Sequence, residues 1–463
     1  MPMHRRPALW PTPSLPFLLL CALLGVFWLA GGASRADVLG QVVVRAAAWA
    51  AVIAAILFAG RSSFRPVGAP ALFLLAAVLL AVAQLVPLPP DIWRALPGRA
   101  SLADAAIVSG QGQPWRPWSI VPGATANALS SLIVPAATLI LLRWIEPSER
   151  ARLAGLVLGL VFAATLVGLF QFSAVGFNNP FVNDSPGQVA GTFANRNHFA
   201  LFVAIGCLIA PVWAFGGDEQ PRWRAPAALG LVLLFALTIL ASGSRAGLAL
   251  GALAIALGLL IARRGIARAL RRYPRWALPA LIAGVVATLA IFVLISVAAD
   301  RAVSIQRALE VDPGQDMRTR GLPTVLAMVR AYFPVGAGLG GFDPLFRMHE
   351  PFDLLKFTYF NHAHNDLLEV VLDAGIAGLA LLAAAALWWA WASVRAWRAG
   401  SGLGNAVPRL GGAALALVLL ASASDYPART PLIMALIAIA ATWLEGRDGG
   451  RRGSALPRKS HHL

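Results

Sequence analysis

Three short polar segments carry the side chains of this chain that are best suited to chemistry. They are residues 191–198 (Gly-Thr-Phe-Ala-Asn-Arg-Asn-His), 242–247 (Ser-Gly-Ser-Arg-Ala-Gly) and 361–366 (Asn-His-Ala-His-Asn-Asp). Their candidate functional residues are Asn195, Arg196 and His198 in the first segment, Arg245 in the second, and His362, His364, Asn365 and Asp366 in the third, with Glu369 three residues further on.

Arg196 and Arg245 indicate anion binding. An arginine among apolar spans is costly unless it faces water or a partner, although either one alone could instead snorkel or cap a helix. A guanidinium stays charged, and its planar fork matches phosphate oxygens two at a time. A departing pyrophosphate needs its charge neutralised by a metal ion or by such clamps. The chain has no Asp-x-Asp motif to bind a divalent cation, and the segment most similar to it is Glu310-Val-Asp312. We therefore predict that arginines, and not a metal ion, neutralise this charge.

His364 is the candidate general base. The ordinary histidine pKa of about 6.5 lets a neutral imidazole accept a proton from a hydroxyl near neutral pH. We expect Asp366 or Glu369 to orient it. His364 could instead only position the acceptor or serve a structural role, and His362, His364 and Asp366, with His349, could form a metal site. His-x-His is a weak motif for metal binding.

The composition places these residues in a membrane protein. Of 463 residues, 58% are hydrophobic and 13% charged, and the mean hydropathy is +0.71. Soluble cores cannot hide that much apolar surface, so lipid must solvate most of it. The net charge is +17, but it lies in short loops between apolar runs. This pattern favours membrane topology and lipid headgroups as the explanation, and no nucleic-acid partner is predicted.

Hydropathy predicts an all-α polytopic bundle of about twelve transmembrane helices within a single domain, residues 1–463. The expected spans are 15–33, 38–59, 69–88, 126–145, 151–175, 197–216, 225–241, 246–262, 277–299, 364–392, 408–424 and 429–445. Alternate connections are rich in arginine, for example at residues 150–152, 222–224, 263–275 and 395–409, and so is the tail 446–463. By the positive-inside rule that side is cytoplasmic, which puts all three polar segments on the exported side.

Two exported connections are long enough to carry structure. Residues 89–125 are rich in Pro, Trp and Gly and predict an ordered but irregular cap. Residues 300–363 form a large loop with a predicted amphipathic helix from Thr319 to Tyr332 and a glycine cluster at 336–341. The glycines indicate either tight turns close to a ligand or a flexible connector.

The third segment resembles the bacterial O-antigen ligase and polymerase superfamily of membrane glycosyltransferases. The most specific element is His364-Asn365, then nine residues, then Gly375-Ile-Ala-Gly378. Segments similar to 191–200, 242–247, 334–342 and 425–431 (Asp-Tyr-Pro-Ala-Arg-Thr-Pro) also recur in that group. The resemblance runs from the fifth predicted span to the last.

This resemblance implies a GT-C-like bundle in the bacterial inner membrane, with an inverting, metal-independent active site that faces the periplasm and has no cofactor. The implied donor is a glycan on undecaprenyl pyrophosphate, and the acceptor is lipid A-core, another glycan or another hydroxyl. Arg196 and Arg245 would then hold the pyrophosphate, with Arg318 as a weaker candidate, and His364 would activate the acceptor.

The family does not decide between a ligase and a polymerase that extends lipid-linked repeat units. A transporter of polyprenyl-linked glycans or small molecules is an alternative from another class, and an assembly subunit is a third. Transporters place ionisable residues near the bilayer midplane, whereas here only Arg45 is a basic residue well inside a predicted span.

Overall fold

The computed structural model describes residues 12–59, 67–173, 179–183, 187–216, 222–271, scattered positions in 274–294, and residues 317–355, 360–400 and 405–446. Most of the predicted span 277–299 lies outside these residues, as do 300–316 and nearly all of the tail 446–463.

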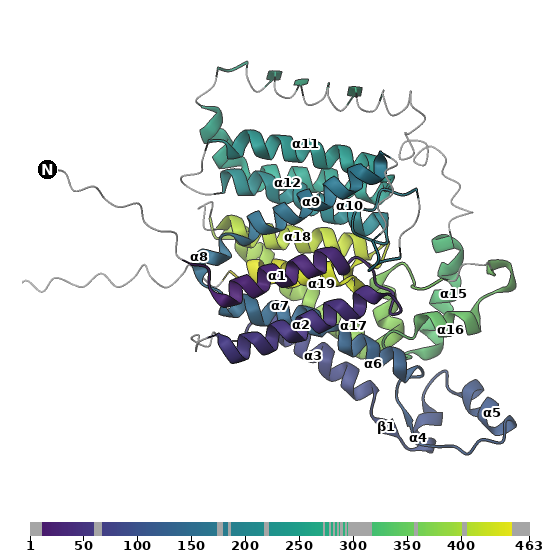
Figure 1. Ribbon diagram of the computed structural model, residues 1–463. Coiled ribbons are helices and arrows are strands. Elements are labelled where there is room, and N and C mark those ends of the chain that lie inside the picture. Colours follow the sequence, from purple (N-terminus) through teal and green to yellow (C-terminus); the bar gives the residue numbers. More distant parts are fainter. Residues whose placement is uncertain are drawn as a thin grey trace, which may run out of the picture.

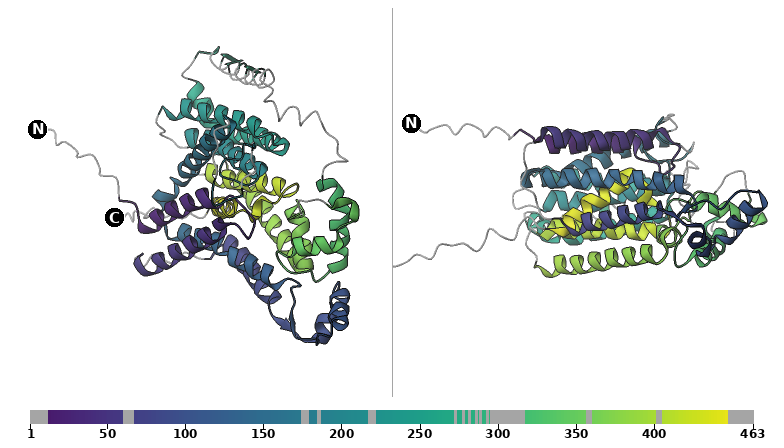
Figure 2. Two further views of the ribbon diagram at one scale, coloured as in Figure 1. Left: turned by 45° about the vertical axis from the view of Figure 1, so that its right-hand side comes forward. Right: turned by 90° about the horizontal axis from the view of Figure 1, so that it is seen from below.

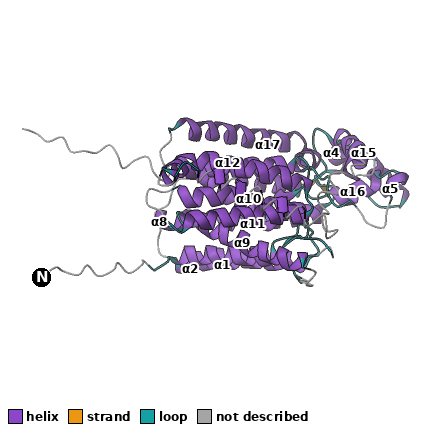
Figure 3. Ribbon diagram, turned by 90° about the horizontal axis from the view of Figure 1, so that it is seen from above, coloured by secondary structure: helices purple, strands orange, loops and turns teal. Residues whose placement is uncertain are grey.

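Long, roughly parallel helices form most of the molecule (Figures 1 and 3). Within the described residues, seven stretches are long and apolar enough to cross a membrane. They are α2 (Leu39–Phe58), α6 with α7 (Pro122–Ser131, Ile133–Trp144), α8 with α9 (Pro147–Arg150, Leu153–Phe172), α10 (Arg196–Phe215), α11 (Arg224–Ser242), α12 (Arg245–Leu270) and α17 (Asp366–Arg398). The same part of the chain holds the shorter apolar helices α1 (Leu15–Ala30), α3 (Ala69–Gln84), α18 (Ala406–Ser422) and α19 (Pro431–Glu445). The predicted helical bundle is thus found, while the number of twelve spans stays a prediction.

α10 is the central helix of the bundle. Its neighbours are α9, α11, α12 and α18, and most of its side chains are buried. A helix that is apolar on every side belongs inside a bundle rather than at its surface. α10 therefore fixes the position of residues 195–198 at its start relative to the other helices.

The two ends of the bundle differ in chemistry. One end carries α4 (Pro90–Ala95), α5 (Ala100–Val108), α15 (Met317–Tyr332) and α16 (Phe342–His349), and we call it the loop end (Figures 1 and 2). The opposite end, near α8, carries the arginines at the helix ends 143–152, 224, 263–268 and 395–409. This separation agrees with the predicted topology, and the cytoplasmic assignment of the arginine-rich end stays a prediction.

Residues 89–125 are more regular than expected. α4 and α5 lie in this loop, and β1 (Pro87–Leu88) pairs with β2 (Arg116–Pro117) in a short antiparallel ladder. Arg99 is fully buried, and its guanidinium donates to the carbonyl oxygens of Pro97, Trp118 and Gly336. Burial lowers the pKa of Arg99 to about 10. The cap is thus tied to the glycine cluster of the second loop.

The glycine cluster is a packed turn rather than a flexible connector. The backbone N–H groups of Ala337 and Gly338 donate to the carbonyls of Leu372 and Asp373 in α17, at 2.9 and 2.8 Å. α17 bends there, because Gly375 has φ 55° and ψ −137°. A Cβ on Gly375 would lie 2.0 Å from the carbonyl oxygen of Pro334. Glycine is therefore required for this close approach.

Candidate functional site

Among the described helices that begin at the loop end, α10, α12 and α17 are each capped by a residue of one of the three polar segments. The caps are Asn195 on α10, Ser244 on α12 and Asn365 on α17, whose side-chain oxygens accept backbone N–H hydrogen bonds of 2.8, 2.9 and 3.0 Å. Unpaired N–H groups and the helix dipole make such helix starts favourable places for anions. The sequence placed these segments on one side, and the structure brings their helix starts to the same end.

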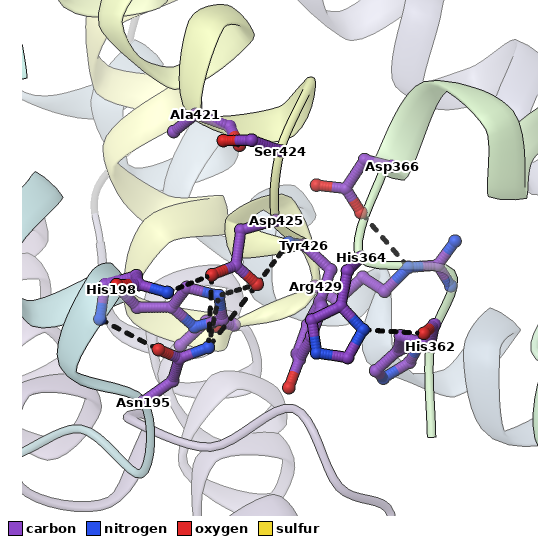
Figure 4. Close-up of polar contacts among 12 residues, drawn as sticks. Asn195, His198, His362, His364, Asp366, Ala421, Ser424, Asp425, Tyr426 and Arg429 are labelled. Carbon is purple, nitrogen blue, oxygen red and sulfur yellow. Dashed lines mark hydrogen bonds and ion pairs between the residues drawn. The ribbon is translucent and has the colours of Figure 1, made fainter. Parts of the chain in front are cut away.

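Asp425 joins these helix starts, and the sequence analysis did not single it out. Its carboxylate accepts from Asn197 Nδ2 at 2.7 Å and from Arg318 Nη2 at 3.2 Å. His198 Nε2 lies 3.6 Å from the other oxygen. Asn197 in turn accepts from the Ser244 hydroxyl at 2.8 Å. One buried carboxylate therefore connects α10, α12 and the long loop. Figure 4 shows Asp425 beside Asn195 and His198.

Arg196 and Arg245 are the first residues of α10 and α12, directly beside the contact between Asn197 and Ser244. Arg196 is half-buried, whereas Arg245 is exposed. The helix starts that carry the two predicted clamps are thus in contact. Their role in binding a diphosphate stays a prediction.

Arg318 lies in α15 and donates to the carbonyl oxygen of Ser424 as well as to Asp425. The Arg318 side chain is 35% exposed to solvent. Its guanidinium is therefore paired on one side and accessible on another. The structure thus places the weakest of the three predicted donor-binding arginines inside the polar cluster.

Tyr426 lies at the centre of three histidine rings. Its ring centroid is 5.0 Å from that of His198, 4.4 Å from His362 and 5.0 Å from His364. Burial, with the charge of Asp425, raises the pKa of Tyr426 to about 12. The neutral Tyr426 ring is thus in contact with imidazoles from two segments that are distant in the sequence (Figure 4).

The backbone holds the imidazole of His364. Nδ1 lies 2.9 Å from the carbonyl oxygen of His362, which can only accept, so Nδ1 carries the proton and the lone pair of the neutral ring is on Nε2. Phe360 stacks on the ring at 4.7 Å, and the residue has a positive φ of 52°. A carbonyl therefore orients His364, and the expected orienting role of Asp366 or Glu369 is wrong.

The pKa values of His364 and Asp425 are both lowered, but for different reasons. Burial lowers the pKa of His364 and the charge of Arg318 reinforces this, whereas the charge of Asp425 and the hydrogen bond to the His362 carbonyl oppose it. Burial alone would raise the pKa of Asp425, but the hydrogen bond and charge of His198, with Arg318 and His364, hold it below its ordinary value. At neutral pH the pair is a neutral imidazole beside an ionised carboxylate.

The carboxylates predicted to support His364 face Arg429 instead. Arg429 Nε lies 3.2 Å from Asp366, and its Nη2 lies 3.3 Å from Glu369 and 3.6 Å from Asp373. Because the three acids stand at positions i, i+3 and i+7 of α17, they share one helix face. Burial alone would lower the pKa of Arg429, but these carboxylates raise it.

Glu369 also holds the other histidine of the segment. Its carboxylate accepts from His362 Nδ1 at 2.9 Å and from the backbone N–H of Ala363 at 2.8 Å. The acidic partner expected for His364 thus belongs to His362.

The proposed metal ligands do not converge. His349 bonds to the hydroxyl of Tyr332 at 3.0 Å, His362 faces Glu369, and Asp366 faces Arg429. Among the described residues, no group of three His, Cys, Asp or Glu side chains is placed to hold a metal ion.

The residues that the sequence analysis missed, Asp425, Tyr426 and Arg429, belong to one turn between α18 and α19. The segment 425–431 was noted for its resemblance, and that was the available signal. Hydropathy showed it only as a short connection.

The fold and this cluster define a helical, multi-pass membrane protein with a buried polar site at one end of its bundle. Residues 230–383 match the family model described as O-antigen ligase, and no curated protein matches the chain. The match confirms the resemblance to the O-antigen ligase superfamily, and it spans Arg245, Arg318 and His364. Over residues 230–383 the chain is thus similar to O-antigen ligases. Asp425 and the start of α10 lie outside the matched residues.

Proposed function

We propose that the protein transfers a glycan from undecaprenyl pyrophosphate to an acceptor hydroxyl, on lipid A-core or a similar molecule, at the periplasmic face of a bacterial inner membrane. The observation that carries this proposal is the hydrogen bond from His364 Nδ1 to the His362 carbonyl, which leaves a lone pair on Nε2, in a ring on which the charges of Asp425 and Arg318 act.

In the proposed reaction, Nε2 of His364 accepts the proton of the acceptor hydroxyl. The hydroxyl oxygen attacks the anomeric carbon from the side opposite the pyrophosphate, which leaves with the electron pair of the broken C–O bond. Inversion follows from this single displacement. Arg196, Arg245 and Arg318, together with three helix starts, stabilise the charge on the leaving group, and Asp425 stabilises the imidazolium.

A polymerase that adds the glycan to another lipid-linked repeat unit uses the same chemistry, and the family match favours it equally. Reconstitution of the purified protein with undecaprenyl-pyrophosphate glycan and two acceptors, lipid A-core and a second repeat unit, separates the two. Transfer to lipid A-core in the presence of EDTA is the result expected. Transfer only to the repeat unit would make the protein a polymerase, a strict need for Mg²⁺ or Mn²⁺ would contradict the arginine clamp, and transfer to neither would overturn the proposal.

A further inference from the structure

Arg45 places a positive charge inside the membrane-spanning part of α2. It follows Leu39, the first residue of the helix, by six positions, which puts its Cα about 9 Å along the helix from the loop end. Its guanidinium donates to Asn127 Oδ1 at 2.8 Å and Ser130 Oγ at 2.7 Å, both in α6. It also donates to Gln41 Oε1 at 3.2 Å.

All of these partners are neutral. Among the described residues, no carboxylate is paired with Arg45, and its buried Nε has no hydrogen-bond partner. A charged side chain at such a depth normally faces water or an opposite charge. Nor does Arg45 snorkel to the helix end, because Asn127 and Ser130 hold its head group within the span.

This polar group lies at the outer surface of the bundle. Val42, Trp49, Ile53 and Ile56 are exposed, and their spacing of seven, four and three residues places them along one face of α2. Ser130 is also exposed. Arg45 borders this apolar face, so lipid can reach the polar group from the side.

We propose that Arg45, Asn127 and Ser130 form a site for the phosphate of one anionic phospholipid, whose acyl chains lie along the exposed face of α2. One guanidinium neutralises the single charge of a phosphodiester, whereas a polyprenyl diphosphate carries more charge than this site can match. The occupant is therefore a phospholipid and not the glycan donor. This proposal can be tested separately from the proposed transferase activity, because lipid binding is measured without turnover.

The test is native mass spectrometry of the full-length protein in mixed micelles with equal phosphatidylglycerol and phosphatidylcholine. The wild-type protein should retain phosphatidylglycerol preferentially. Arg45→Gln should lower that retention about tenfold, the effect of losing charge-assisted hydrogen bonds to one phosphate, while phosphatidylcholine is unchanged. Arg94→Gln, in an exposed pair with Asp91, is the matched control and should bind as the wild type does.

Arg45→Lys keeps the charge and should keep most of the preference for phosphatidylglycerol over phosphatidylcholine. This variant tests the proposal if Arg45→Gln fails to fold. Equal retention of phosphatidylglycerol by the wild-type protein and a folded Arg45→Gln would overturn the proposal. So would displacement of phosphatidylglycerol from the wild-type protein by an equal concentration of undecaprenyl pyrophosphate, because the occupant would then be the donor lipid.

Discussion

The carboxylate of Asp425 accepts a hydrogen bond of 3.2 Å from Arg318, across 107 positions of the sequence. This contact ties α15 of the long loop to the turn between the last two helices. The same carboxylate binds Asn197 at the start of α10. Asp425 thus sets the relative positions of a predicted phosphate-binding arginine and the helix start that carries another.

Asp425→Asn should reduce glycan transfer by about 100-fold, because displacing binding groups by about 1 Å is enough for such a loss. The rate is measured with the reconstituted donor and acceptor, and folding is checked by thermal melting. Asp343→Asn, which removes an exposed pair with Arg347, should leave the rate unchanged. An Asp425→Asn protein with the full rate would show that the carboxylate has no part in the site.

His364→Ala should reduce transfer by about 10²–10⁴-fold, the usual contribution of a general base, while the protein still inserts at normal levels. His349→Ala is the control, because His349 contacts Tyr332 outside the cluster. Full activity of the His364→Ala protein in a membrane assay would remove His364 from the mechanism.

The acid limb of the pH profile should lie below pH 6.5. Burial lowers the pKa of His364 from its ordinary value of 6.5, so the ring stays unprotonated and able to accept a proton at a pH where an exposed histidine is already half protonated. The measurement is kcat/KM between about pH 4.5 and pH 8.5, a range of about two units either side of the ordinary histidine pKa. An acid limb above pH 7, or one that persists in a residually active His364→Gln protein, would contradict this assignment.

Arg245→Ala should reduce transfer by about 10²-fold or more, because it removes one clamp on the departing charge. Its thermal stability should hardly change, since the side chain is exposed and truncation of such residues usually changes the free energy of unfolding by about 0.5 kcal/mol or less. Activity and melting are measured on the same preparation. Loss of stability in parallel with activity would indicate a structural role instead.

Gly375→Ala should destabilise the protein by about 3 kcal/mol or prevent folding, because a side chain at this φ and ψ is strained and its Cβ would meet the Pro334 carbonyl at 2.0 Å. Gly25→Ala is the matched control, since a Cβ at this helix position in α1 meets nothing within 4 Å. Thermal melting in detergent measures both. Equal stability of the two variants would mean that the bend in α17 is not fixed by this contact.

Much of the bundle follows from the sequence alone. A stretch of apolar residues long enough to cross a membrane must satisfy its backbone internally, so hydropathy locates helices such as α10 and α11 to within a few residues. The amphipathic helix expected from Thr319 to Tyr332 is α15. The sequence also predicts that the arginine-rich connections and the three polar segments lie at opposite ends of the bundle, because each span reverses the side on which the next connection lies.

Tertiary structure decided which polar groups meet. Sequence spacing placed Asp366 and Glu369 near His364, but the first turns of α17 direct both acids toward Arg429, about 60 positions later in the chain. No local pattern marks Asp425 or Tyr426 as the residues that join the three polar segments, because those contacts exist only once α10, α15 and the α18–α19 turn are packed together. The sequence therefore determined the helices and the end at which the chemistry lies, whereas long-range packing chose the partners of each charge.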